Sequence, residues 1–218
     1  MCRLLKYFFL IFIFFFFKTN VVLSEENNYF TSGGNYKSHR FSELDKINIQ
    51  NIKNLDIAWI FKHDLESKND PTAANALTPI LAKDSLIFAS VDGNLISLNP
   101  STGKLNWKRK YNGHKNLAKR GLVFQKIKHN NTYKDVVFVP TDSTVLTVSP
   151  EDGKIIYDLG DEGKVGKNGT GLAPIIADNN IYISSGSTIK SYNLENYFKN
   201  WEINLNGARV WSGFSYDR

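Results

Sequence analysis

Residues 98–107, with the sequence LNPSTGKLNW, decide the fold of this chain. Pro100 presets its own φ and Gly103 accepts a positive φ without a Cβ clash, so the stretch forms a tight turn. Trp107 follows on the strand that leaves this turn. Just before it, residues 85–98 form two β-rich runs around an Asp-Gly pair, which is a strong hairpin signal. The stretch therefore predicts three antiparallel strands in succession.

The same unit recurs at residues 134–159 and 173–205, and repeats of this length have to be recognised before any other fold is considered. The aromatic residues that close the units lie 48, 50 and 44 residues apart: Trp59, Trp107, Tyr157 and Trp201. This spacing suits about four short strands per unit, and beyond the first seventeen residues no helical periodicity is convincing. We expect an all-β fold, a partial β-propeller of four-stranded antiparallel blades, with the three tryptophans packed between blades.

Residues 1–24 predict an export signal, because basic residues precede an unbroken apolar run at 7–17 and residues of modest size precede Glu25. A run of eleven is shorter than the roughly 20 residues that a membrane-spanning helix needs. We expect cleavage and a periplasmic or otherwise exported protein, or a membrane anchor if the segment is retained. The single cysteine, Cys2, lies inside the signal, so the mature chain has no disulfide and depends on packing.

We expect three regions: the signal peptide at 1–24, an N-terminal extended segment at 25–50 and an incomplete β-propeller at 51–218. The propeller region holds about three blades and parts of flanking blades, whereas closed rings have about four to eight. From Trp211 onward, the chain is expected to begin a further blade. Without the three basic residues of the signal, the net charge falls from +6 to +3, and no basic cluster with stacking aromatics supports nucleic-acid binding.

The repeat resembles the tryptophan-docking repeat of the PQQ-dependent (quinoprotein) alcohol and glucose dehydrogenases, which are eight-bladed propellers that bind pyrroloquinoline quinone (PQQ). Further segments carry the resemblance in the order of the family: residues 35–61, Thr78-Pro79 with the strand after it, Arg120-Gly121, and GARVWSGFSYD at 207–217. Together they cover most of the chain from Asn35 onward. The resemblance implies the N-terminal part of an enzyme that oxidises an alcohol or a sugar hydroxyl.

The resemblance also implies three cofactor-binding residues. PQQ is a planar quinone with three carboxylates, so its site requires cations at the rim and a flat aromatic floor. Arg120 matches the family arginine that contacts the quinone, and a guanidinium can pair with a carboxylate through two parallel hydrogen bonds. Trp211 matches the tryptophan beneath the quinone, and Thr170 lies near a hydroxyl that bonds it. The alternatives are a solvated basic loop for Arg120 and ordinary blade packing for Trp211.

PQQ and calcium are the cofactors that the resemblance implies, with a membrane quinone or a cytochrome as the electron acceptor. No calcium ligand can be assigned, the catalytic aspartate of the family is not in this sequence, and Ala76 stands where some members have a glutamate. These departures leave a second interpretation open, a non-catalytic propeller that binds proteins or glycans. Similar repeats occur in scaffolds of outer-membrane protein assembly, so the fold by itself leaves activity undecided.

Overall fold

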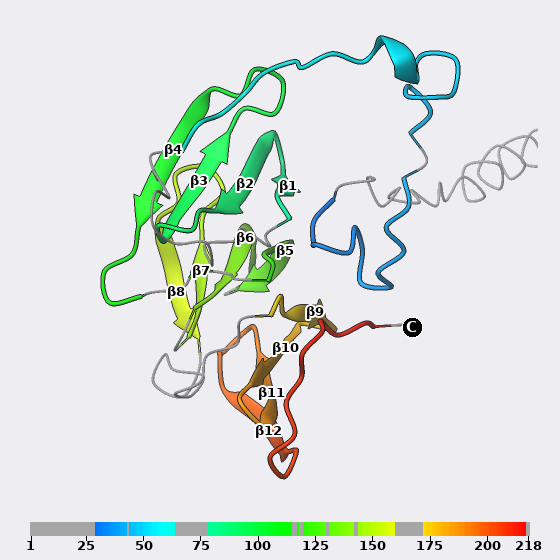
Figure 1. Cartoon of the computed structure of the whole chain (residues 1–218). Coiled ribbons are helices and arrows are strands. Elements are labelled where there is room, and N and C mark those ends of the chain that lie inside the picture. Colours follow the sequence, from blue (N-terminus) through cyan, green and yellow to red (C-terminus); the bar gives the residue numbers. More distant parts are fainter. Residues whose placement is uncertain are drawn as a thin grey trace, which may run out of the picture.

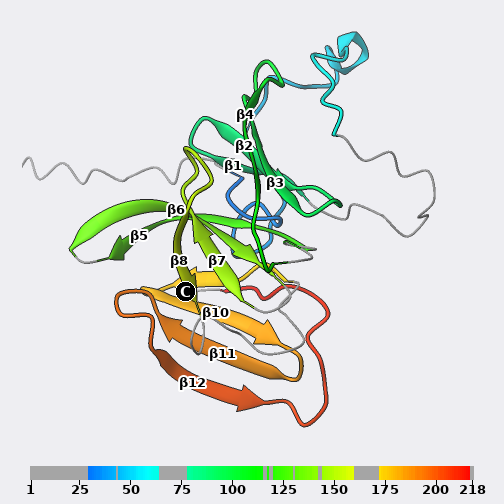
Figure 2. The same ribbon diagram turned by 90° about the vertical axis from the view of Figure 1, so that its left-hand side faces the viewer.

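Three four-stranded antiparallel sheets follow one another along an arc (Figures 1 and 2). The computed structural model describes residues 29–42, 44–63, 78–114, 117, 120–129, 131–141, 144–159 and 172–216. The elements in chain order are η1 (Ile52–Asn54), β1 (Ile80–Ala82), β2 (Ser85–Ala89), β3 (Asn94–Leu98), β4 (Leu105–Lys110), β5 (Val123–His129), β6 (Thr132–Pro140), β7 (Val145–Val148), β8 (Ile155–Leu159), β9 (Ile175–Ala177), β10 (Asn180–Ser185), β11 (Thr188–Asn193) and β12 (Lys199–Asn204).

Each sheet is a meander, and we name them blade 1 (β1 to β4), blade 2 (β5 to β8) and blade 3 (β9 to β12). The predicted hairpin forms between β2 and β3, where Ile87 pairs with Ser97 and the turn between the strands contains Gly93 at a φ of +78°. The all-β, partial-propeller fold with four-stranded antiparallel blades is therefore confirmed.

The turn between the third and fourth strands has the same geometry in all three blades. In blade 1, Gly103 donates its N–H to the Asn99 carbonyl (2.9 Å) at a φ of +67°. Gly153 makes the equivalent bond in blade 2, also at +67°. In blade 3, Tyr197 occupies this position at +62°, and its buried ring lies 4.9 Å from the His129 ring of blade 2. The third repeat thus folds like the others with a non-glycine residue in the left-handed region.

Two of the closing tryptophans dock on these turns. Trp107 on β4 donates its Nε1–H to the Pro150 carbonyl of blade 2 (2.9 Å), and its ring covers Gly153 so closely that a Cβ there would lie 2.7 Å from it. Trp59 makes the same contacts with blade 1, to the Pro100 carbonyl (2.9 Å) and against Gly103. The docking role predicted for Trp59 and Trp107 is confirmed.

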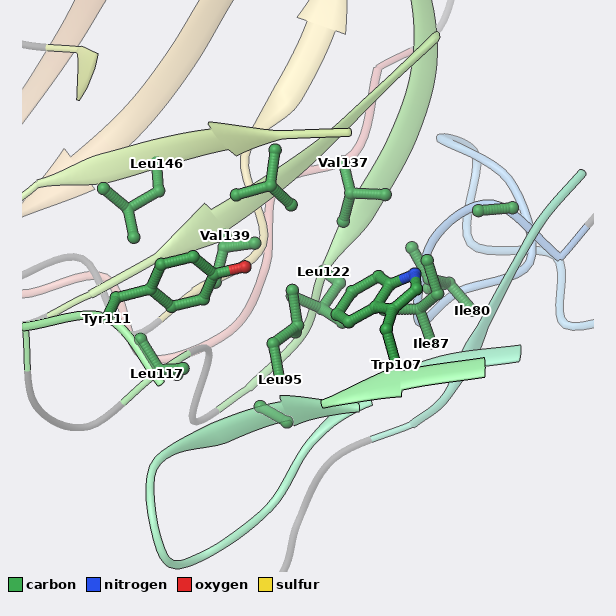
Figure 3. Close-up of a cluster of buried hydrophobic side chains, with 13 residues drawn as sticks. Ile80, Ile87, Leu95, Trp107, Tyr111, Leu117, Leu122, Val137, Val139 and Leu146 are labelled. Atoms are coloured by element: carbon green, nitrogen blue, oxygen red, sulfur yellow. The ribbon is translucent and has the colours of Figure 1, made fainter. Parts of the chain in front are cut away.

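The apolar core between blades 1 and 2 surrounds the Trp107 ring (Figure 3). Tyr111, just after β4, adds a hydrogen bond from its hydroxyl to the Gly153 carbonyl (2.8 Å), and burial raises the pKa of this phenol. A second core between blades 2 and 3 includes Phe138, Ile183 and Tyr192, each no more than 1% exposed. The blades are therefore held together mainly by packing between sheet faces, as expected for a chain without disulfides.

The predictions for Trp201, Tyr157 and the segment from Trp211 onward are not confirmed by the structure. Trp201 is 40% exposed, and the centre of its ring lies 5.9 Å from the centre of the Tyr182 ring of its own blade. The docking of Trp201 on a following blade stays a prediction. The side chain of Tyr157 lies outside the described residues. The described residues from Trp211 to Tyr216 form no strand and belong to none of the three sheets. The strand expected there is not observed.

Residues 29–36, here called the axial segment, lie beside β1, β5 and β9 on the inner side of the arc (Figure 1, blue). Each of these innermost strands donates one backbone N–H to the segment: Leu81 to the Tyr29 carbonyl (2.9 Å), Phe124 to the Phe30 carbonyl (2.8 Å) and Ile176 to the Tyr36 hydroxyl (3.2 Å). These bonds satisfy edge groups that the sheets leave unpaired. One short segment thus ties all three blades together.

The predicted export signal at 1–24 lies outside the described residues. In the part of the chain that the structure describes, no helix has the length and hydropathy to cross a bilayer. The division of the chain into regions 1–24, 25–50 and 51–218 stays a prediction.

An ion-pair cluster also bridges blades 1 and 2. Lys83, in the β1–β2 turn, pairs with Asp135 on β6 (2.6 Å) and with Glu151 in the β7–β8 turn. Burial pushes the pKa of the Glu151 carboxyl upward, but hydrogen bonds from Lys83 and Ser149 outweigh burial and hold the pKa below its usual value. A carboxyl with a lowered pKa stabilises the folded state above its usual titration range and loses that contribution as the pH falls.

Replacing Lys83 with methionine is expected to reduce the acid dependence of stability. The ionised Glu151 loses its lysine partner, so the difference in unfolding free energy between pH 7 and pH 3 should shrink by about 0.2–1 kcal/mol, the range for exposed ion pairs. Urea denaturation at the two pH values measures this difference. Lys134→Met, at an exposed lysine on β6, is the control, and an equal change in both variants would contradict the assignment.

Candidate cofactor-binding site

The strand order places the segments that leave β4 and β12 at the same end of their blades. Because antiparallel strands alternate in direction, the β2–β3 turn and the connection that leaves β4 lie at one end of a blade, and the β1–β2 and β3–β4 turns lie at the other. Arg120 lies in the connection between β4 and β5, and Trp211 lies in the segment that leaves β12. Equivalent connections thus carry both residues.

Arg120 and Trp211, 91 residues apart in sequence, are in direct contact. The Arg120 Nη1 donates a hydrogen bond to the Trp211 carbonyl (2.6 Å), and the guanidinium carbon lies 5.6 Å from the centre of the indole ring. A cation at this distance from an aromatic face is attracted by the ring. Trp211 is 70% exposed in this structure. The structure therefore brings together the two residues for which the sequence predicted a common site.

The backbone around Arg120 is held from several sides. Arg120 forms an isolated parallel bridge with Leu172, and Leu122 is fully buried in the core between blades 1 and 2. Gly121 has a φ of +136°, and a Cβ there would lie 3.0 Å from the Ala173 Cβ and 3.2 Å from the Ser32 Oγ. A larger residue at this position would strain the backbone and crowd both neighbours. The RG pair thus places an exposed guanidinium beside a closely packed glycine.

The chemistry of this pair suits a flat anion. Among the described residues, no carboxylate lies within ion-pair distance of Arg120, and one of its N–H groups is used by the Trp211 carbonyl. The remaining N–H groups form a planar donor fork that matches a carboxylate, and the exposed indole offers an aromatic surface next to it. The donor set fits PQQ, whose carboxylates and fused rings need these two kinds of group.

Other predicted site features cannot be placed. Thr170 and Ala76 lie outside the described residues, so the role of Thr170 stays a prediction. No cluster of three or more His, Cys, Asp or Glu side chains suitable for a metal occurs within the described ranges. Calcium as a cofactor stays a prediction.

Sequence reasoning missed the axial segment as a neighbour of the site. Its Ser32 side chain lies against Gly121, and its Tyr36 carbonyl accepts a hydrogen bond from Tyr216 N–H (3.0 Å), five residues after Trp211. The only local signal is the glycine pair at 33–34, which indicates a tight turn. That signal indicates a turn, but it does not indicate that the turn lies beside Gly121.

Comparisons with known proteins agree with this architecture. A family model described as the glucose/ethanol/alcohol dehydrogenase β-propeller domain of PQQ type matches residues 30–194. The quinoprotein glucose dehydrogenase of Gluconobacter oxydans is 34% identical over 142 residues, which are 60% of this chain and 18% of that protein. The dehydrogenase subunit of the alcohol dehydrogenase (quinone) of Gluconacetobacter polyoxogenes is 25% identical over 167 residues, 72% of this chain and 22% of that protein.

A solved structure shows the same fold. The quinohemoprotein alcohol dehydrogenase of Comamonas testosteroni superposes with a TM-score of 0.63 at 21% identity, covering 82% of this chain and 27% of that one. The chain spans about a fifth of the length of the curated relatives named above. Since the family model covers most of the chain and the docked tryptophans and blades agree with it, the chain belongs to the PQQ-dependent dehydrogenase family, by its β-propeller domain.

Proposed function

We propose that this chain is the N-terminal propeller portion of an exported PQQ-dependent dehydrogenase that oxidises an alcohol or a sugar hydroxyl, and that it supplies part of the quinone site. The contact between Arg120 and Trp211 carries the proposal. An exposed cation and an exposed indole that meet from separate blade connections provide the rim and the floor that a planar tricarboxylate needs. The export signal predicted at 1–24 is the basis for proposing an enzyme that works outside the cytoplasm.

The residues of this chain bind and orient the cofactor. Arg120 pairs with a carboxylate of the quinone through two parallel hydrogen bonds. This pairing fixes the orientation of the quinone and places a positive charge beside the carboxylate. The Trp211 ring supports the quinone from one face through apolar contact. Thr170 adds a hydroxyl contact in this proposal. When bound, PQQ supplies the two-electron acceptor for oxidation of the substrate.

The family relatives bear on the substrate class. The curated relatives are named for glucose and for alcohol, so a sugar or alcohol hydroxyl is the substrate class that we propose. A membrane quinone or a cytochrome is the proposed electron acceptor, and calcium is the proposed second cofactor.

Replacing Arg120 with alanine is expected to weaken PQQ binding by about 10- to 150-fold. Loss of hydrogen bonds to a charged carboxylate corresponds to roughly 1.5–3 kcal/mol. The measurement is a titration of the whole, calcium-supplied protein with PQQ, followed by quinone absorbance. Lys128→Ala, at the far end of β5, removes the same charge and is expected to leave the affinity within about twofold, as a surface change remote from the ligand.

The same titration tests the proposal as a whole. Saturable uptake of PQQ by the full-length enzyme that contains this chain, together with dye reduction in the presence of an alcohol or an aldose, supports it. If the unaltered protein takes up no PQQ, the proposed function is wrong, and a non-catalytic propeller becomes the better interpretation.

A further inference from the structure

The axial segment is bonded to both parts of the chain that carry the candidate site. Thr31 pairs with Val123, three residues after Arg120, in an isolated antiparallel bridge. At the other end of the segment, the Tyr36 carbonyl accepts the N–H of Tyr216, five residues after Trp211 (3.0 Å). Arg120 and Trp211 belong to connections separated in sequence by all of blades 2 and 3. The axial segment therefore provides a short structural link between them.

The segment has a defined internal shape. Gly34 donates its N–H to the Thr31 carbonyl (2.9 Å) at a φ of +83°, which closes a tight turn. The Phe30 and Tyr36 rings pack edge to face across this turn, with centroids 5.1 Å apart and planes at 76°. The two ends of the axial segment are thus in contact with each other, so we expect a shift at one end to move the other.

Tyr36 anchors the link to blade 3. Its hydroxyl accepts the Ile176 N–H (3.2 Å) from β9, an edge amide that no sheet neighbour uses. Burial raises the pKa of the Tyr36 phenol above its ordinary value, and the hydrogen bond from Ile176 only partly opposes this. The phenol therefore stays neutral, and its loss would leave a backbone donor without its acceptor.

We infer that the axial segment sets the separation between Arg120 and Trp211, and that Tyr36 is a positioning residue of the candidate site. The inference rests on the proposed function only for the identity of the ligand, because the link between the two side chains exists in the chain itself. Tyr36 acts through the strands that carry the site. The candidate site for a flat anion is thus formed with the help of the segment that precedes the first blade as well as by the blade connections.

The first test follows Trp211 directly, without any cofactor. The whole protein is labelled with 5-fluorotryptophan, and the ¹⁹F resonances of Trp211 and Trp107 are assigned by single Trp→Phe variants. Tyr36→Phe is expected to shift or broaden the Trp211 resonance and to leave the Trp107 resonance unchanged. The matched control is Tyr133→Phe, at a tyrosine that is 72% exposed on β6, which should move neither resonance.

A second variant tests whether the whole axial segment, and not only the Tyr36 hydroxyl, affects Trp211. Gly34→Ala places a Cβ 3.3 Å from the Tyr29 ring at a φ of +83°, so it distorts the turn of the axial segment. It should also move the Trp211 resonance, whereas Gly93→Ala, in a left-handed turn with no atom within 4 Å of the added Cβ, should not. An unmoved Trp211 resonance in both axial variants, with native circular dichroism, would overturn the inference.

The second test asks whether Tyr36 acts through Arg120 in ligand binding. PQQ affinity is measured for Tyr36→Phe in the unaltered protein and in the Arg120→Ala background. We expect about five- to tenfold weaker binding in the unaltered protein and less than about twofold in the Arg120→Ala background, the signature of coupled sites. Equal weakening in both backgrounds would mean that Tyr36 serves general stability, and the inference would be wrong. If the unaltered protein binds no PQQ, the proposed function fails, and the fluorine experiment alone decides the inference.

Discussion

Replacing Trp107 with alanine is expected to lower the free energy of unfolding by about 3–5 kcal/mol, the range for truncating a large buried aromatic side chain. The ring is 9% exposed, lies in the core between blades 1 and 2, and donates a hydrogen bond to the Pro150 carbonyl (2.9 Å). Its removal leaves a cavity and a carbonyl without its donor. Urea denaturation of the whole protein, followed by far-ultraviolet circular dichroism, measures the loss.

Trp107→Phe separates the two contributions. Phenylalanine keeps an aromatic ring on the Gly153 face but cannot donate to the Pro150 carbonyl, so its cost should be clearly smaller than that of alanine. If Trp107→Ala changes stability by less than about 1 kcal/mol, docking of this residue is not a main contact between the blades.

Gly153→Ala is expected to lower the free energy of unfolding by about 2–4 kcal/mol. About 1–2 kcal/mol arises from a Cβ in the left-handed region at a φ of +67°. The rest arises from overpacking, because the added Cβ would lie 2.7 Å from the Trp107 ring and 2.8 Å from the Arg109 Cγ. The measurement is the same denaturation experiment.

Gly93→Ala is the matched control for this second prediction. Gly93 also has a positive φ, +78°, but no atom lies within 4 Å of an added Cβ. Only the backbone cost of about 1–2 kcal/mol is expected. Equal losses at Gly93 and Gly153 would show that the Trp107 ring can move away at little cost.

The repeat motif predicted the blades because its information is local. A proline, a glycine and a hairpin pair specify turns within a few residues, and alternating apolar residues specify strands between them. Gly103 and Gly153 have the positive φ that the motif predicts. In the third repeat Tyr197 stands in place of the glycine, and the hydrogen-bonded turn is retained.

The candidate site was only partly predictable. The family resemblance singled out Arg120 and Trp211, but their contact depends on how the blades are placed around the axis. The axial segment was missed because its hydrogen bonds join residues 50 to 180 positions apart, such as Tyr29 with Leu81 and Tyr36 with Tyr216. Edge amides of a strand can donate to any nearby backbone carbonyl, so no residue pattern identifies the partner.

By itself, the sequence determined the strands, the turns and the docking of Trp59 and Trp107, because local backbone preferences and a regular aromatic spacing encode them. Only the tertiary structure decided that Arg120 meets Trp211 and that the axial segment links the strands around them. The physical reason is that these contacts form between backbone groups and exposed side chains from distant segments, whose meeting depends on the angle and stacking of whole sheets.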